Sequence, residues 1–118
     1  MDSEAIQGTF QDGTAVTIVI SAADILIGMR RTRLLMEAQR ATDIDIDVTL
    51  VRFLYTDVAA AMTRFQPNGS EAGSVLPIPF ETFIRLSDTT GAQLEQAVYR
   101  LNPHWRPVTR GEQEDPKD

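Results

Sequence analysis

The chain's only histidine and only tryptophan are neighbours, His104 and Trp105. A histidine can act as a general base, but nucleophilic catalysis also needs an activated serine or cysteine. The chain has no cysteine and no recognisable nucleophile motif, and one histidine does not make a typical metal site. A structural role is favoured, in which Trp105 folds back over the last helix as an apolar lid with His104 at its edge.

The segment Asp43-Ile44-Asp45-Ile46-Asp47 copies the opening of a calcium-binding loop. Such a loop needs glycine at its sixth position and glutamate at its twelfth, where this chain has Val48 and Leu54. The match fails, and the segment is interpreted as an acidic connector in which Asp47 caps the next helix. Phosphate loops, dinucleotide fingerprints and nucleophile elbows are also lacking. We expect no enzyme, cofactor or metal.

A basic cluster, Gly28-Met29-Arg30-Arg31-Thr32-Arg33, is a candidate contact for phosphate or for an acidic partner. On a helix these arginines point in several directions and can pair with Glu37 or Asp24. The formal net charge of −6 and the pI near 4.7 disfavour nucleic acid. Pairing within the chain is the favoured interpretation, and contact with a partner is the alternative.

A chain of 118 residues suits one domain with one modest core. No apolar run approaches the roughly 20 residues of a membrane span, and the acidic start lacks the basic flank of a secretory signal. We therefore expect one globular domain over residues 1–108, no membrane association, and a cytoplasmic location. The polar residues 109–118 are expected to form a disordered tail.

Strand and helix patterns predict an α+β, mainly α fold, with an N-terminal β-hairpin and about four helices around one small core. Asp12-Gly13 supplies a tight turn, and alternating β-branched residues follow it, so the hairpin is placed at about 8–20. Apolar periodicity and capping patterns place the helices at about 22–41, 48–65, 79–86 and 90–101. The glycine-rich segment 66–74 is expected to be a loop.

The expected helix 22–41, with a capping box at Ser21-Ala22-Ala23-Asp24, is apolar on two sides. One stripe holds Ile25, Met29 and Met36, and the other holds Ile27, Leu34 and Ala38. Such a helix is either enclosed in the core or covered by a partner.

Three short motifs together resemble the tail assembly chaperones of long-tailed phages and prophages. They are Gly28-Met29-Arg30-Arg31, Phe53-Leu54-Tyr55 and the terminal Leu101-Asn102-Pro103-His104-Trp105. The order of elements is similar too, from the hairpin to the short Pro-Phe-Glu-Thr-Phe helix and the Asn-Pro-His-Trp end. The likeness covers roughly residues 9 to 107.

The resemblance implies a non-enzymatic protein of the host cytoplasm that is absent from the mature virion. Proteins of this family bind the long helical tape measure protein and keep it soluble while the tail tube forms. In many of them a translational frameshift adds a domain that recruits tail tube subunits, so tube subunits are a further expected partner. The family supplies no catalytic, cofactor-binding or metal-binding residues.

A chaperone of this kind needs an exposed apolar surface to cover the stripes of a helical client. We place that surface on the stripe Ile27, Leu34 and Ala38, which serves either the tape measure protein or self-association of chaperone copies. Arg30, Arg31 and Trp105 complete the candidate partner-binding residues.

Two other functions remain open from the sequence. One is a phage head–tail joining or tail-terminator protein, a class that tends to be richer in strands and to form rings. The other is a small helical regulator whose arginine helix touches DNA.

Overall fold

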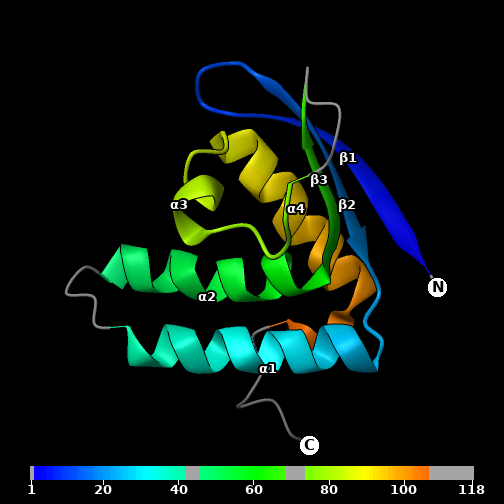
Figure 1. The fold of residues 1–118 in the computed structure, drawn as a ribbon, viewed down its shortest axis with the longest axis vertical. Helices are drawn as coiled ribbons and strands as arrows, with labels where there is room; N and C mark the ends of the chain where they lie inside the picture. Colours follow the sequence, from blue (N-terminus) through cyan, green and yellow to red (C-terminus); the bar gives the residue numbers. More distant parts are fainter. Residues whose placement is uncertain (1, 42–45, 69–73, 107–118) are drawn as a thin grey trace, which may run out of the picture.

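The computed structural model describes residues 2–41, 46–68 and 74–106. The elements in chain order are β1 (Ser3–Thr9), β2 (Ala15–Ser21), α1 (Ile25–Arg40), α2 (Ile46–Ala61), β3 (Met62–Pro67), α3 (Phe80–Phe83), α4 (Asp88–Leu101) and a 3-10 turn, η1 (Pro103–Trp105). The expected α+β, mainly α fold is confirmed. In Figure 1, α4 lies against the sheet, while α1 and α2 form an antiparallel pair beneath it.

The N-terminal hairpin is present and is longer than expected at its first strand. β1 pairs with β2 in antiparallel register from Ser3↔Ser21 to Thr9↔Ala15. At the turn, Gly13 has a positive φ of 89°, and the Thr14 amide donates to Asp12 Oδ1 at 2.9 Å. Only glycine adopts this backbone region without strain, which explains the Asp-Gly signal.

The third strand, β3, was not predicted, because residues 62–65 were assigned to the helix 48–65 and residues 66–67 to the loop 66–74. That prediction is wrong: α2 ends at Ala61, and β3 pairs antiparallel with β2, with Phe65 opposite Ile18. Met62 and Phe65 are three residues apart, a spacing typical of a helix face. Here a register shift at Val19/Ile20 lets both side chains enter the core from a strand.

Helix starts also differ from the expected ones. α1 begins at Ile25 because Asp24 is its N-cap, accepting from the Ile27 amide at 2.8 Å, and Ser21 belongs to β2. α4 begins at Asp88 with Ser87 as its N-cap, not Thr90. α3 covers only Phe80–Phe83 of the expected 79–86. The expected connector spanned residues 43–47, of which 43–45 lie outside the described residues, as does the expected tail at 109–118. The prediction that Asp47 caps a helix starting at 48 is wrong, because α2 begins at Ile46 and Asp47 lies in its first turn.

Both ends of α4 are held by buried polar side chains. At its start, Thr90 Oγ1 accepts from the Thr9 amide at 2.8 Å and donates to the Thr9 carbonyl at 3.1 Å. At its end, Asn102 accepts from the Ala23 amide at 2.7 Å and donates to the carbonyls of Ser21 and Val98. These bonds join α4 to the hairpin and to the start of α1, so the helix has one fixed position on the sheet.

The core lies between the sheet, α4 and the last turns of α2. Its fully enclosed side chains share an apolar character, and they include Ile18, Ile20, Val58, Met62, Phe65, Leu94 and Val98. β-branched residues fill the inward positions of β2, since they pack well on a pleated surface.

Gly8 of β1 lies where the hairpin packs closely against Thr90 of α4. A Cβ at this position would lie 2.6 Å from Thr90 Cγ2. Gly8→Ala is therefore expected to lower the free energy of unfolding by about 1–3 kcal/mol through overpacking. Chemical denaturation measures this change, with Gly28→Ala as the matched control.

At Gly28, within α1, an added Cβ meets nothing within 4 Å. Gly28→Ala is expected to raise stability by about 0.5–1 kcal/mol, because alanine is the better helix former. Equal effects of the two substitutions would contradict the close contact between Gly8 and Thr90.

Candidate functional site

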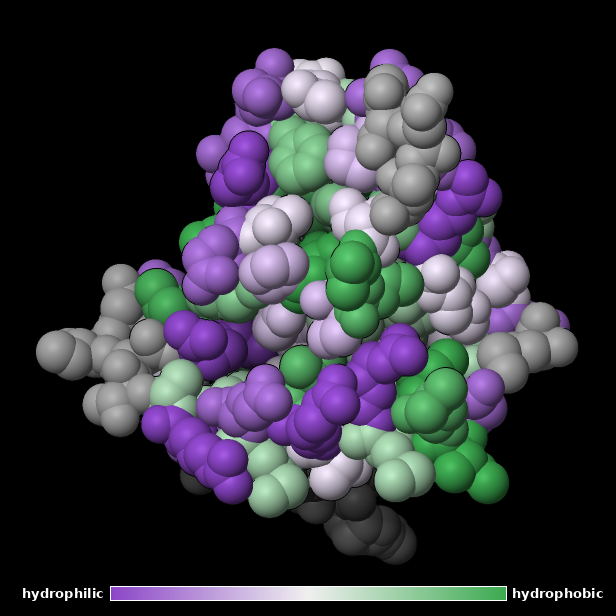
Figure 2. Space-filling view, in the orientation of Figure 1, coloured by the Kyte–Doolittle hydropathy of each residue, from purple (hydrophilic) through white to green (hydrophobic). Residues whose placement is uncertain are grey.

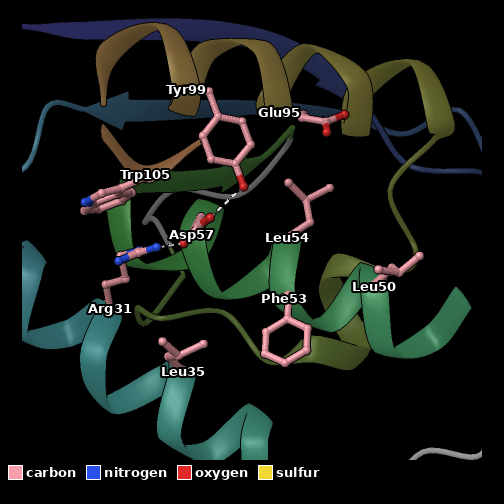
Figure 3. A pocket seen from close by; sticks show the side chains of 9 residues that line it. All are labelled: Arg31, Leu35, Leu50, Phe53, Leu54, Asp57, Glu95, Tyr99 and Trp105. Atoms are coloured by element: carbon pink, nitrogen blue, oxygen red, sulfur yellow. Dashed lines mark hydrogen bonds and ion pairs between the residues drawn. The ribbon is translucent and has the colours of Figure 1, made fainter. Parts of the chain in front are cut away.

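A groove lies between α2 and α4 on the side that also faces α1 and η1 (Figure 3). Its volume is about 530 Å³. Its walls come from four elements, and their side chains are Arg31, Leu35, Leu50, Phe53, Leu54, Asp57, Glu95, Tyr99 and Trp105. We call it the α2–α4 groove.

A second hollow extends this groove along α4. It has a volume of about 440 Å³ and adjoins the first hollow, with which it shares the lining residues Leu54 and Glu95. It reaches Ile84 after α3 and Asp88 at the start of α4. The combined groove therefore follows α4 over most of its length, from Asp88 to Tyr99.

Much of the groove wall is apolar and open to solvent. Leu50 is 61% exposed and Phe53 is 38% exposed, and Ile84 stands clear of the core as well. The exposed parts of these side chains gain no burial in the isolated fold. Contiguous exposed apolar surface of this kind marks an interaction site more often than a feature of the fold.

The inner end of the groove carries a buried polar cluster. The Asp57 carboxylate on α2 accepts from Arg31 Nε of α1 and from the Tyr99 hydroxyl of α4, each at 2.6 Å. Figure 3 shows the two bonds meeting at Asp57. The Arg31 guanidinium also lies 4.8 Å from the centre of the Trp105 ring. The cluster ties three helices and η1 together at one carboxylate.

The Tyr99 hydroxyl acts in this cluster as a protonated hydrogen-bond donor to Asp57. Burial raises the pKa of Tyr99 well above its ordinary value of 10.0, and the hydrogen bond to Asp57 and the negative charge of Asp57 raise it further. The phenol therefore stays protonated, and its hydroxyl donates its hydrogen bond to Asp57.

The polar groups at the inner end of the groove are bonded to one another. Arg31, Asp57 and Tyr99 satisfy one another, and His104 is exposed with its ring centre 5.9 Å from that of Trp105. Within the described ranges, no group of three or more histidine, cysteine, aspartate and glutamate side chains is arranged to hold a metal ion.

The stripe that the sequence placed at a partner surface is buried. Ile27, Leu34 and Ala38 are 4%, 6% and 9% exposed, and Ile27 and Leu34 join the core. The expectation that they lie free for a partner is wrong. α1 turns this face toward α2, and Arg31, on the same side of the helix, pairs with Asp57 of α2.

The opposite side of α1 is the exposed one. Its large apolar side chains are Ile25, Leu26, Met29 and Met36, which we call the outward face of α1. Figure 2 shows a hydrophobic patch over the N-terminal end of α1, at the lower right of the view. The idea of a helix apolar on two sides was sound, but the two sides were assigned in reverse.

The other candidate residues lie close to the groove or within it. Arg31 and Trp105 line it, while the Arg30 guanidinium donates to the Ala60 carbonyl at 3.4 Å. Trp105 is 7% exposed and packs at the end of α4, which confirms its expected role as a lid with His104 at its edge.

Sequence reasoning missed the groove residues Leu50, Phe53, Asp88 and Glu95. Leu50 falls on the broad apolar face of α2, a pattern typical of core residues. The sequence did contain an indication of the groove. The apolar face of α2 is too wide to be covered completely by the sheet and one neighbouring helix, so part of it must stay exposed.

Comparison with protein-family models, with curated proteins and with solved structures gives no match to this chain. Of the helices in the described part of the chain, none combines the length and the apolar character needed to cross a membrane.

Two aspartate substitutions on opposite sides of α1 test which face is core. Leu34→Asp places a charge in the core and is expected to cost at least about 3 kcal/mol or to unfold the domain. Met29→Asp lies on the outward face and is expected to cost about 0.5 kcal/mol. Thermal unfolding followed by circular dichroism measures both. A folded Leu34→Asp chain with wild-type stability would contradict the assignment.

The raised pKa of Tyr99 makes stability depend on alkaline pH. An unfolded chain ionises its tyrosines near pH 10.0 and the folded chain does not, so the stabilisation is complete below that pH and falls as the pH rises above it. Tyr99→Phe should lose about 1.5–3 kcal/mol at neutral pH, because a bond to a carboxylate is removed.

The pH dependence is measured by denaturant titration at neutral and alkaline pH. The alkaline loss should be smaller in Tyr99→Phe than in the wild type. Some loss remains in the variant, because burial also raises the pKa of Tyr55, whose hydroxyl donates to the Ile78 carbonyl. An alkaline loss of the same size in both proteins would show that Tyr99 does not titrate differently on folding.

Proposed function

We propose that this chain is a non-enzymatic binding protein that holds an apolar helical partner in the α2–α4 groove. Because three sequence motifs resemble those of tail assembly chaperones, the tape measure protein of a long-tailed phage is the preferred partner. On this proposal the chain is a tail assembly chaperone that keeps the tape measure protein soluble while the tail tube forms.

The observation that carries the proposal is the apolar wall of the groove, formed by the exposed Leu50, Phe53 and Ile84 and the half-buried Leu54. A groove between two helices accepts a third helix by covering its apolar stripe, as in other helix-in-groove complexes. Long apolar stripes aggregate when exposed, so covering them keeps their owner in solution.

The outward face of α1 gives the chain a second apolar surface. It is available for tail tube subunits or for a neighbouring chaperone copy along the client. In this role the chain acts in the host cytoplasm and does not enter the mature virion.

Co-expression tests the proposal. The DNA beside this gene is expected to encode a very long helical reading frame. Its product should be recovered mainly in the soluble fraction when this chain is co-expressed, and mainly as aggregate when an unrelated acidic protein of similar size replaces it. The measurement is the soluble fraction of the long protein after centrifugation.

Two results would contradict the proposal. One is a long protein that aggregates equally with and without this chain. The other is a stable closed ring formed by this chain alone, which is the behaviour of a head–tail joining or tail-terminator protein.

A further inference from the structure

We infer that the α2–α4 groove selects one amphipathic helix whose apolar stripe is flanked by basic residues two helical turns apart. The inference rests on the proposed function for the existence of a helical partner, and it adds the partner's charge and the residues that recognise it.

The shape of the groove sets the size of the partner segment. α4 has 14 residues, which corresponds to roughly 21 Å at 1.5 Å per residue. The α4 residues that line the groove run from Asp88 to Tyr99, so a partner helix that lies along α4 engages the groove over about three turns. Its apolar side chains meet Leu50, Phe53 and Leu54 on one wall and Ala92 on the other.

The charge of the groove is negative along its α4 wall. Asp88 and Glu95 are exposed, and neither forms an ion pair with another described residue. Arg31 is the one basic side chain among the residues that line the two described hollows, and Asp57 already neutralises it at 2.6 Å. Two carboxylates therefore remain for a ligand.

The spacing of these carboxylates fixes the spacing of the partner's basic residues. Asp88 and Glu95 are seven residues apart on one helix, or roughly 10 Å along its axis. Two basic residues at positions i and i+7 of an aligned helix match that distance. Apolar residues on the adjacent side of the same helix then face α2.

The net charge of the whole chain also favours a basic partner helix. Its formal net charge of −6 attracts a basic segment and repels an acidic one during approach. An uncharged apolar helix would gain the groove contacts but not the two ion pairs.

The molecule carries its own reporter for binding. Trp105 is the chain's only tryptophan and lines the inner end of the groove. A helix that covers this end changes the surroundings of the indole ring. A peptide without tryptophan can therefore be titrated into the full chain while Trp105 emission is recorded.

The test uses three synthetic amphipathic peptides of about 18 residues, long enough to fill the groove. They share one leucine stripe and differ only at two flanking positions seven residues apart, which hold arginine, glutamine or glutamate. The arginine peptide is expected to bind about tenfold more tightly than the glutamate peptide at low salt, because two exposed ion pairs replace two repulsions. The difference should shrink as salt is raised.

Charge-reversal variants locate the selectivity. Glu95→Arg and Asp88→Arg should each reduce the preference for the arginine peptide, and the double variant should reverse it. Glu81→Arg is the matched control, since Glu81 is exposed on α3 and lines neither hollow. It should leave the preference unchanged. Circular dichroism confirms that each variant is folded.

Phe53→Asp tests the groove itself, and it should weaken all three peptides while the fold is retained. Equal binding of the three peptides would overturn the charge selectivity. Binding that Phe53→Asp leaves unchanged would overturn the groove assignment. Neither result bears on the co-expression experiment, which decides the proposed function separately.

Sedimentation of the peptide-free chain supplies the last test. A second copy of this chain is another candidate occupant of the groove. Its α1 carries the apolar outward face, and Arg33 and Arg40, seven residues apart, lie on the same side of that helix. The free chain is expected to remain monomeric at the concentrations of the titration. Self-association that both Phe53→Asp and Met29→Asp abolish would assign the groove to a second copy and overturn the inference.

Discussion

One buried carboxylate, Asp57, holds the helical part of this molecule in its arrangement. It accepts from Arg31 of α1 and from Tyr99 of α4 while it stands on α2, so the three helices share a single polar contact. An unpaired charge at this depth would be costly. Each of the three helices is therefore confined to the geometry in which the cluster is complete.

The consequences of this contact extend to both apolar surfaces. Arg31 lies on the side of α1 that faces α2, together with the buried stripe of Ile27, Leu34 and Ala38, and the outward face of α1 is left in solvent. Because Tyr99 reaches Asp57 only at the end of α4, the two helices join there and leave the groove open along Leu50 and Phe53. The same interaction thus stabilises the fold and shapes the candidate binding site.

The sequence predicted those parts of the fold that depend on local patterns. The Asp12-Gly13 turn, four helices and the lid of Trp105 follow from turn chemistry, periodicity and the aromatic residue after the last helix. β3 was missed because Met62 and Phe65 suit a helix as well as a strand, and only pairing with β2 decides between them. The buried side of α1 was missed for a related reason: both sides are apolar, and only packing against α2, distant in sequence, decides between them. Long-range contacts of this kind leave no local signal.

Hydrogen exchange on the full chain, alone and saturated with a basic amphipathic helix, tests the central claim most directly. If the helix occupies the α2–α4 groove, added protection will concentrate in the first turns of α2 and in α4 around Glu95. Amides of β3 and of the hairpin will exchange as they do in the free protein. Protection confined to α1 or to the free edges of the sheet, with α2 and α4 unchanged, would contradict the account.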